Sequence, residues 1–240
     1  MSRRSLSSLV LALAAPMLLA FCARAEAGDL EGALLIVDAP PGTPGSEPLG
    51  APPRFALLGD GQVFVGGTSQ LETTRLAKDE LAALRKRIET VRKAVERDGP
   101  PPAESAGPSA VRVRFFEGRT IELQLDPRRL AEPAPARGPA ARQPAALLTA
   151  LVGELLRYDH PALVRYAPAS YALSAQQRTL VGGCRPWTFS FPIEDAVAAP
   201  TAVHARDAVG WPTGALPASV CAGDKRFSVT LRPLLPGERP

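Results

Sequence analysis

An alternation of apolar and polar residues that occurs twice, each time ahead of a helical pattern, most constrains the fold of this chain. In the first occurrence, Phe55 and Leu57 alternate with polar or small neighbours, and Val63 and Val65 do so across a Gly-Asp-Gly turn. Placing all four apolar side chains on one face of a sheet requires Leu57 to lie opposite Val63. That register pairs Phe55 with Val65 as well. It predicts a β-hairpin with a three-residue loop, in which Gly61 takes the left-handed conformation.

A helix is predicted over residues 78–97, directly after this hairpin. Its apolar residues recur at steps of three and four, which places them on one stripe of a helix. The stripe consists of Leu81, Leu84, Ile88, Val91 and Val95. Gly99 and the three prolines that follow it end the helix.

The same order of elements is predicted a second time, about 60 residues further along by turn position. Val111, Val113 and Phe115 alternate with arginines, and Ile121, Leu123 and Leu125 alternate with polar residues. Matching the two apolar faces places Phe115 opposite Ile121, which demands an odd-length loop or a bulge. A connector rich in Pro, Ala and Arg over 126–144 leads to a second predicted helix over 145–158. The stripe of that helix is Leu148, Leu151, Val152 and Leu155.

These patterns predict an α+β protein whose antiparallel sheet is built from two hairpin–helix units, with an additional strand at 33–37. The units occupy 28–158, and their common order suggests a duplication, a hypothesis that requires the same strand order in both. The remainder, 159–240, contains both tryptophans and two cysteines. Its predicted strands are 187–191, 201–205 and 226–231, so we expect a β-rich lobe tied by a disulfide.

The disulfide is predicted between Cys184 and Cys221, the two cysteines outside the N-terminal 27 residues. Two thiols that reach an oxidising compartment most simply pair with each other. Closing a loop of that length stabilises a fold by roughly 4 kcal/mol on the chain-entropy model. The alternative is two buried, unpaired cysteines.

Residues 1–27 have the features of a cleaved export signal. Arg3 and Arg4 precede an apolar run over 9–21, which is shorter than the ~20 residues that a permanent membrane span needs, and Ala25-Glu26-Ala27 follows. Two other types of leader are alternatives. The run before Cys22 resembles a lipoprotein signal, in which that cysteine is acylated, but the family pattern has a small residue where Phe21 stands. The arginine pair faintly resembles a twin-arginine signal. We predict a periplasmic or secreted protein, with a lipid anchor on the membrane as the alternative.

The composition excludes several classes of protein. The hydrophobic share of 45% against 22% charged residues is typical of a folded globular chain. No second long apolar segment follows the leader, so no transmembrane span is predicted in the mature chain. The net charge of +4 falls to +2 when the leader takes three arginines and one glutamate with it. So small an excess does not predict nucleic acid as a partner.

The segment 53–63, followed by Glu80-Leu81 and Leu84, resembles a segment of uncharacterised bacterial secreted proteins and lipoproteins of unknown function. The resemblance covers only the first hairpin and helix. It implies an exported bacterial protein, and it supplies no catalytic or binding residues.

No metal, cofactor or catalytic site is predicted. A transition-metal site needs three or four converging ligands, whereas His160 and His204 lie far apart in sequence, each with one nearby aspartate, Asp159 or Asp207. We interpret both histidines as structural, with His160 placed to complement the C-terminal dipole of the preceding helix. The Gly-x-Ser-x-Gly motif of many hydrolases is absent.

Other residues that could act in catalysis or ligand binding also have a structural interpretation. Glu194 and Asp195 adjoin in the chain, and neighbours on a strand point to opposite faces, which suits a solvated turn better than the paired carboxyls of a glycosidase. Trp187 and Trp211 are predicted to form the core of the small C-terminal lobe, with a sugar- or peptide-stacking surface as the alternative. The pairs Gly66-Gly67 and Gly182-Gly183 lack the neighbours of a phosphate-binding loop.

The sequence therefore favours a non-catalytic exported protein that binds another envelope protein. Two alternatives stay open: an envelope hydrolase with dispersed catalytic residues, and an inhibitor-like structural scaffold that presents a concave sheet.

Overall fold

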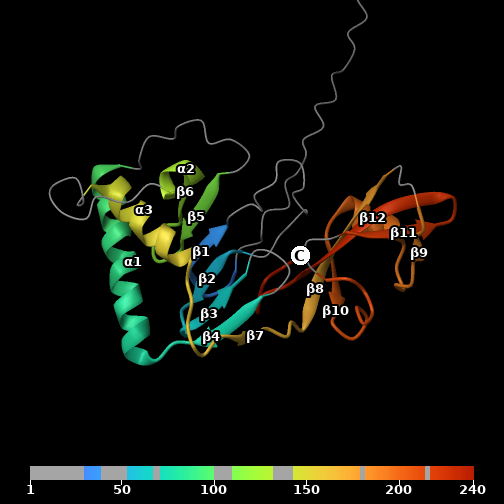
Figure 1. Cartoon of the computed structure of the whole chain (residues 1–240), viewed down its shortest axis with the longest axis horizontal. Coiled ribbons are helices and arrows are strands. Elements are labelled where there is room, and N and C mark those ends of the chain that lie inside the picture. The colour runs from blue at the N-terminus through green and yellow to red at the C-terminus, as the bar shows by residue number, and fades with distance from the viewer. Residues whose placement is uncertain are drawn as a thin grey trace, which may run out of the picture.

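The computed structural model contains two lobes, each built on its own sheet (Figure 1). It describes residues 30–38, 53–66, 71–99, 110–131, 143–178, 182–213 and 217–240. The predicted leader with Cys22 and the proline-rich segment 40–52 of the sequence lie outside the described residues. Within the described part, no helix is both long and apolar enough to cross a membrane.

The first lobe is built on a seven-stranded antiparallel sheet, which confirms the predicted α+β class. Its order is β6-β5-β1-β2-β3-β4-β7. The strands are β1 (Ala33–Asp38), β2 (Phe55–Leu58), β3 (Gln62–Val65), β4 (Glu72–Arg75), β5 (Val111–Phe115), β6 (Ile121–Leu125) and β7 (Val164–Arg165).

Both predicted hairpins are present in the predicted register. Leu57 lies opposite Val63 in β2–β3, and Phe115 lies opposite Ile121 in β5–β6 across a five-residue loop. Gly61 has φ +86°, as the three-residue loop requires. Alternation alone could fix these registers because a slip of one residue would turn every apolar side chain to the wrong face.

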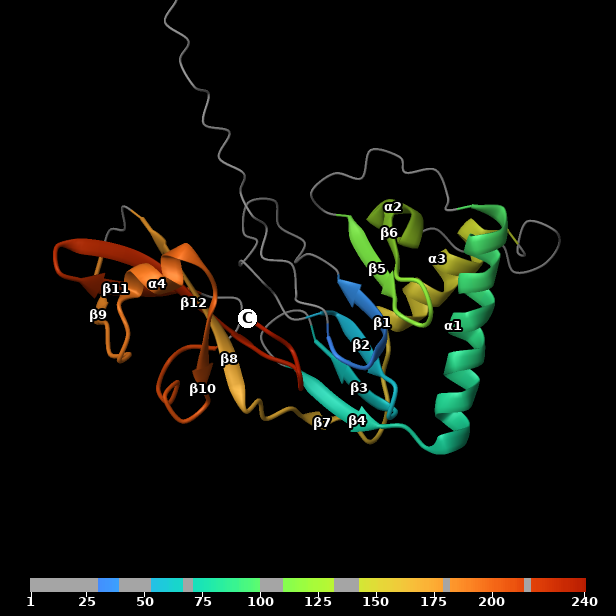
Figure 2. The same ribbon diagram turned by 180° about the vertical axis from the view of Figure 1, so that it is seen from behind.

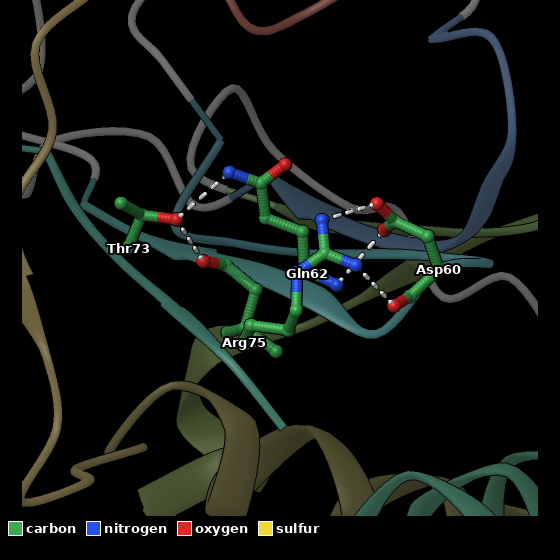
Figure 3. Close-up of polar contacts among 5 residues, drawn as sticks. Asp60, Gln62, Thr73 and Arg75 are labelled. Carbon is green, nitrogen blue, oxygen red and sulfur yellow. Dashed lines mark hydrogen bonds and ion pairs between the residues drawn. The ribbon is translucent and has the colours of Figure 1, made fainter. Parts of the chain in front are cut away.

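A polar cluster holds the first hairpin turn against β4 (Figure 3). Arg75 donates to the backbone oxygen of Asp60 (3.0 Å) and to its carboxylate (2.7 Å). The same carboxylate accepts the Gln62 N–H at 3.0 Å, and this bond is the main reason that the pKa of Asp60 lies below its ordinary value. Thr73 donates to the Val63 carbonyl at 2.8 Å and accepts from the Gln62 amide at 3.4 Å. These groups satisfy one another, so we interpret the cluster as structural.

Gly61→Ala is expected to lower the free energy of unfolding by about 1–2 kcal/mol, because the left-handed conformation penalises a Cβ atom. A Cβ atom there would also lie 3.2 Å from Leu81 Cδ2, which is tighter than an ordinary contact. Gly32→Ala is the matched control: its φ is +75°, but a Cβ atom there meets nothing within 4 Å. Urea unfolding of the two variants checks this. An equal or smaller loss for Gly61→Ala would contradict the contribution of the Leu81 contact.

Helices cover one face of the first sheet (Figure 1). The helices of this lobe are α1 (Lys78–Asp98), α2 (Pro127–Ala131) and α3 (Pro144–Leu155). The predicted apolar stripe of α1 packs in the core, where Ile88 is 2% exposed. Glu80 accepts the Ala77 N–H at 2.9 Å and so caps the start of α1. Arg87 binds Glu154 through both terminal guanidinium nitrogens, which fastens α1 to α3.

Three elements of the first lobe were not predicted. β4 reads Glu-Thr-Thr-Arg and carries no apolar alternation, because it lies near the edge of the sheet, where three of its four side chains reach at least partly into solvent. α2 falls in the segment interpreted as a connector. β7 contributes only two residues, and it extends the first sheet past the predicted boundary at residue 158.

The strand order contradicts the duplication hypothesis. β1 lies between the two hairpins and pairs with β2 on one side and β5 on the other, both antiparallel. The two hairpins therefore extend the sheet in opposite directions from β1, so the units do not share one strand order. Sequence spacing could not reveal this, because it carries no information about which edge of β1 each hairpin occupies.

The second lobe is a five-stranded mixed sheet in the order β10-β8-β12-β11-β9 with one short helix. Its elements are β8 (Ser170–Gln177), β9 (Arg185–Pro186), α4 (Ile193–Ala198), β10 (Thr201–His204), β11 (Ala218–Ala222) and β12 (Lys225–Pro233). The predicted strands at 201–205 and 226–231 are confirmed. The strand predicted at 187–191 is wrong, since the indole of Trp187 donates to the Phe191 carbonyl (2.7 Å) and its ring packs on those of Phe189 and Phe191 in a loop.

Cys184 and Cys221 are paired as predicted, with Cα atoms 5.6 Å apart. Cys221 lies in β11, and Cys184 directly precedes β9, which pairs parallel with β11. The disulfide therefore fastens the shortest strand of the second sheet to its neighbour.

The C-terminal residues return from β12 to the first lobe, and the C terminus lies between the two lobes in both views (Figure 1, Figure 2). Leu235 packs in the apolar cluster on the helix-free face of the first sheet, together with Phe64. Tyr166 donates to the Leu234 carbonyl at 3.1 Å. The turn at 234–238 thus joins the two lobes.

Candidate functional site

The candidate site is a groove of about 520 Å³ between β6 and the C-terminal end of α1. β6 is the edge strand of the first sheet, where β5 is its only partner among the described residues. Its lining residues are Val95, Glu96, Gly99, Arg119, Thr120, Ile121, Glu122 and Leu123. We call this site the β6 groove.

An apolar floor and a charged rim characterise the β6 groove. Val95 and Leu123 are 3% and 7% exposed and form the floor. Glu96 and Glu122 on the rim are each within ion-pair distance of an arginine, Arg92 at 3.2 Å and Arg112 at 3.3 Å respectively.

Arg119 is the remaining charge on the rim of the β6 groove. Its side chain is exposed, and among the described residues it forms no ion pair. The lining has neither a nucleophilic thiol nor a histidine. An open strand edge directs alternate N–H and C=O groups outward, so this arrangement can hold an extended polypeptide.

The structure places the two histidines in different lobes. His160 Nδ1 accepts the Ala162 N–H at 3.2 Å, and Nε2 lies 3.5 Å from the carboxylate of Glu80. The ring stacks on Tyr158. His160 therefore faces the start of α1, although the sequence predicted that it complements the end of α3. His204 is exposed on β10. Among the described residues, no three His, Cys, Asp or Glu side chains gather as a metal-ligand set.

Glu194 and Asp195 lie in the first turn of α4, and both are exposed. The prediction of a solvated turn placed them correctly in solvent but missed the helix. Carboxylates favour this position because the positive end of the helix dipole lies there.

The two tryptophans pack together with ring centroids 6.0 Å apart. Trp211 is 6% exposed, and its indole N–H lies 3.3 Å from the Thr188 hydroxyl. Arg185 stacks over the Trp211 ring at 4.1 Å. Trp211 belongs to the buried core of the second lobe, and Trp187 is partly buried against it. This arrangement supports the structural interpretation.

Buried charges on the helix-free side of the first sheet were missed by the sequence analysis. Arg114 is 5% exposed and contacts the carboxylate of Asp38 at 3.1 Å. Burial raises the pKa of Asp38, although the nearby charge of Arg114 opposes this shift. Arg232 contacts Glu238 at 2.6 Å. For Arg114, the alternation over 111–115 was the sequence signal, because it turns arginines to the face opposite the apolar side chains.

Comparison of the chain with protein families, with characterised proteins and with solved structures finds no match. The likeness of 53–63 to bacterial exported proteins therefore stays a prediction, as do the hydrolase and scaffold alternatives.

Proposed function

We propose that this chain is an exported, non-catalytic protein of the bacterial envelope that binds another protein in the β6 groove. The observation that carries this proposal is the open edge of β6 beside an apolar groove. A strand edge supplies main-chain hydrogen bonds, and an adjacent groove supplies selectivity for side chains.

Two further observations support the proposal. The Cys184–Cys221 disulfide suits an oxidising compartment, in keeping with the predicted export signal. The two tryptophans of the second lobe, which could otherwise form a stacking surface, are engaged in structural contacts. The β6 groove is therefore the binding surface that we favour among the described residues.

A photo-crosslinking amino acid at Thr120 tests the proposal. Thr120 is exposed on the rim of the groove, so the probe does not disturb the core. Val209 in the second lobe is 79% exposed and serves as the matched control position. Irradiation in the living bacterium is expected to yield a discrete protein adduct from Thr120 but not from Val209. The absence of any protein adduct at Thr120, or equal labelling at both positions, would refute the proposal.

A further inference from the structure

We propose that the protein bound at the β6 groove is a second copy of this chain, joined by antiparallel pairing of the two β6 strands across a two-fold axis. This inference rests on the proposed function, since it names the partner of the same site. It follows from the sequence of β6, Ile-Glu-Leu-Gln-Leu, and from the faces on which the structure places these side chains.

Antiparallel pairing of identical strands must place residues of the same face opposite each other, because the two-fold axis perpendicular to the sheet preserves its faces. A five-residue strand centred on Leu123 meets this condition. Leu123 then lies opposite Leu123 of the second copy, and Ile121 lies opposite Leu125. All of these apolar residues belong to the helix-covered side. The helices of both copies therefore lie on the same side of one continuous sheet.

The helix-free face is complementary in the same register. Glu122 lies opposite Gln124 of the second copy, and the symmetry repeats this pair. A carboxylate accepts a hydrogen bond from a primary amide, and no like charges face each other. Both side chains are exposed in the single chain. Arg112 lies opposite Gln124 on β5 and within 3.3 Å of Glu122, so one cation stands behind each pair.

The other sheet edges offer fewer strand residues for pairing with a second chain. β7 and β9 each contribute two residues and β10 contributes four, whereas β6 contributes five. The proposed register also places Leu125 of the second copy opposite Ile121, which lines the β6 groove. The strand and the groove that it borders are thus covered by one and the same partner.

Sedimentation equilibrium of the chain as recovered from the expressing bacterium tests the inference, with Gln124→Glu as the main variant. This change sets two carboxylates opposite each other twice in the dimer. Within one chain it places a carboxylate opposite Arg112, so the fold is not penalised. We expect the parent chain to dimerise and Gln124→Glu to dimerise about tenfold more weakly.

The double variant Glu122→Gln/Gln124→Glu is the matched control. It exchanges the two side chains, which restores the carboxylate–amide pair in the dimer while keeping one carboxylate beside Arg112. We expect its dimerisation to match that of the parent chain. Circular dichroism checks that all three proteins fold alike.

A parent chain that stays monomeric at about 100 µM would overturn the inference. A dimer that Gln124→Glu leaves unchanged would overturn it as well, since the contact would then lie elsewhere. A monomer whose Thr120 probe captures a different protein would refute this inference and leave the proposed function standing. If the Thr120 probe captures no protein and the parent chain stays monomeric, both the proposed function and this inference are refuted.

Discussion

Replacing Glu238 with alanine is expected to lower the free energy of unfolding by about 3–5 kcal/mol, the usual cost of leaving one charge of a buried pair without its partner. The Arg232 and Glu238 side chains are only 6% and 2% exposed, and their charged atoms lie 2.6 Å apart. Glu238 also accepts the Leu235 N–H at 2.9 Å, so the substitution removes a second bond of the C-terminal turn.

A double-mutant cycle separates the ion pair from the rest of this effect. Arg232→Met/Glu238→Ala removes both charges and leaves an apolar chain of similar length in place of the arginine. We therefore expect the double variant to be more stable than Glu238→Ala alone. Glu31→Gln, a change at an exposed carboxylate, is the control and should change stability by less than about 0.5 kcal/mol. Urea unfolding of the parent, Arg232→Met, Glu238→Ala, the double variant and Glu31→Gln measures these differences. Equal stability of Glu238→Ala and the parent would contradict the prediction that the loss of Glu238 leaves a buried charge without its partner.

Removal of the disulfide by Cys184→Ser/Cys221→Ser is expected to cost the second lobe about 4 kcal/mol. The bond closes a loop with a sequence separation of 37 residues, and the chain-entropy model gives a value of this size for such a loop. Because the second lobe has its own core cluster, we expect the loss to fall mainly on that lobe.

Tryptophan fluorescence isolates this effect, since both tryptophans of the chain lie in the second lobe. Fluorescence and far-ultraviolet circular dichroism should report different midpoints in the double serine variant, with the fluorescence midpoint lower. Val209→Ser, at a position of the second lobe that is 79% exposed, serves as the control and leaves the pair intact. Coincident midpoints that are unchanged from the parent would contradict a stabilising role of the bond.

The candidate site could be anticipated from the sequence only in part. The alternation of Ile121, Leu123 and Leu125 predicted a strand with one apolar face, and the structure agrees. That this strand lies at the edge of the sheet, beside the end of α1, depends on pairing between segments far apart in the chain. Likewise, Arg232 and Glu238 gave no sequence signal, because their burial arises from the return of the C-terminal turn to the first lobe.

By itself, the sequence determined the hairpin registers, the helices α1 and α3 and the cysteine pairing. The physical reason is that side-chain periodicity and turn geometry act over a few residues, and the two cysteines outside the predicted leader allow one pairing. The tertiary structure alone decided the place of β1 between the two hairpins, the opposite directions of these hairpins and the aromatic loop at 187–191. Those features result from which surfaces bury each other most completely, and a local pattern does not record which distant segment will cover it.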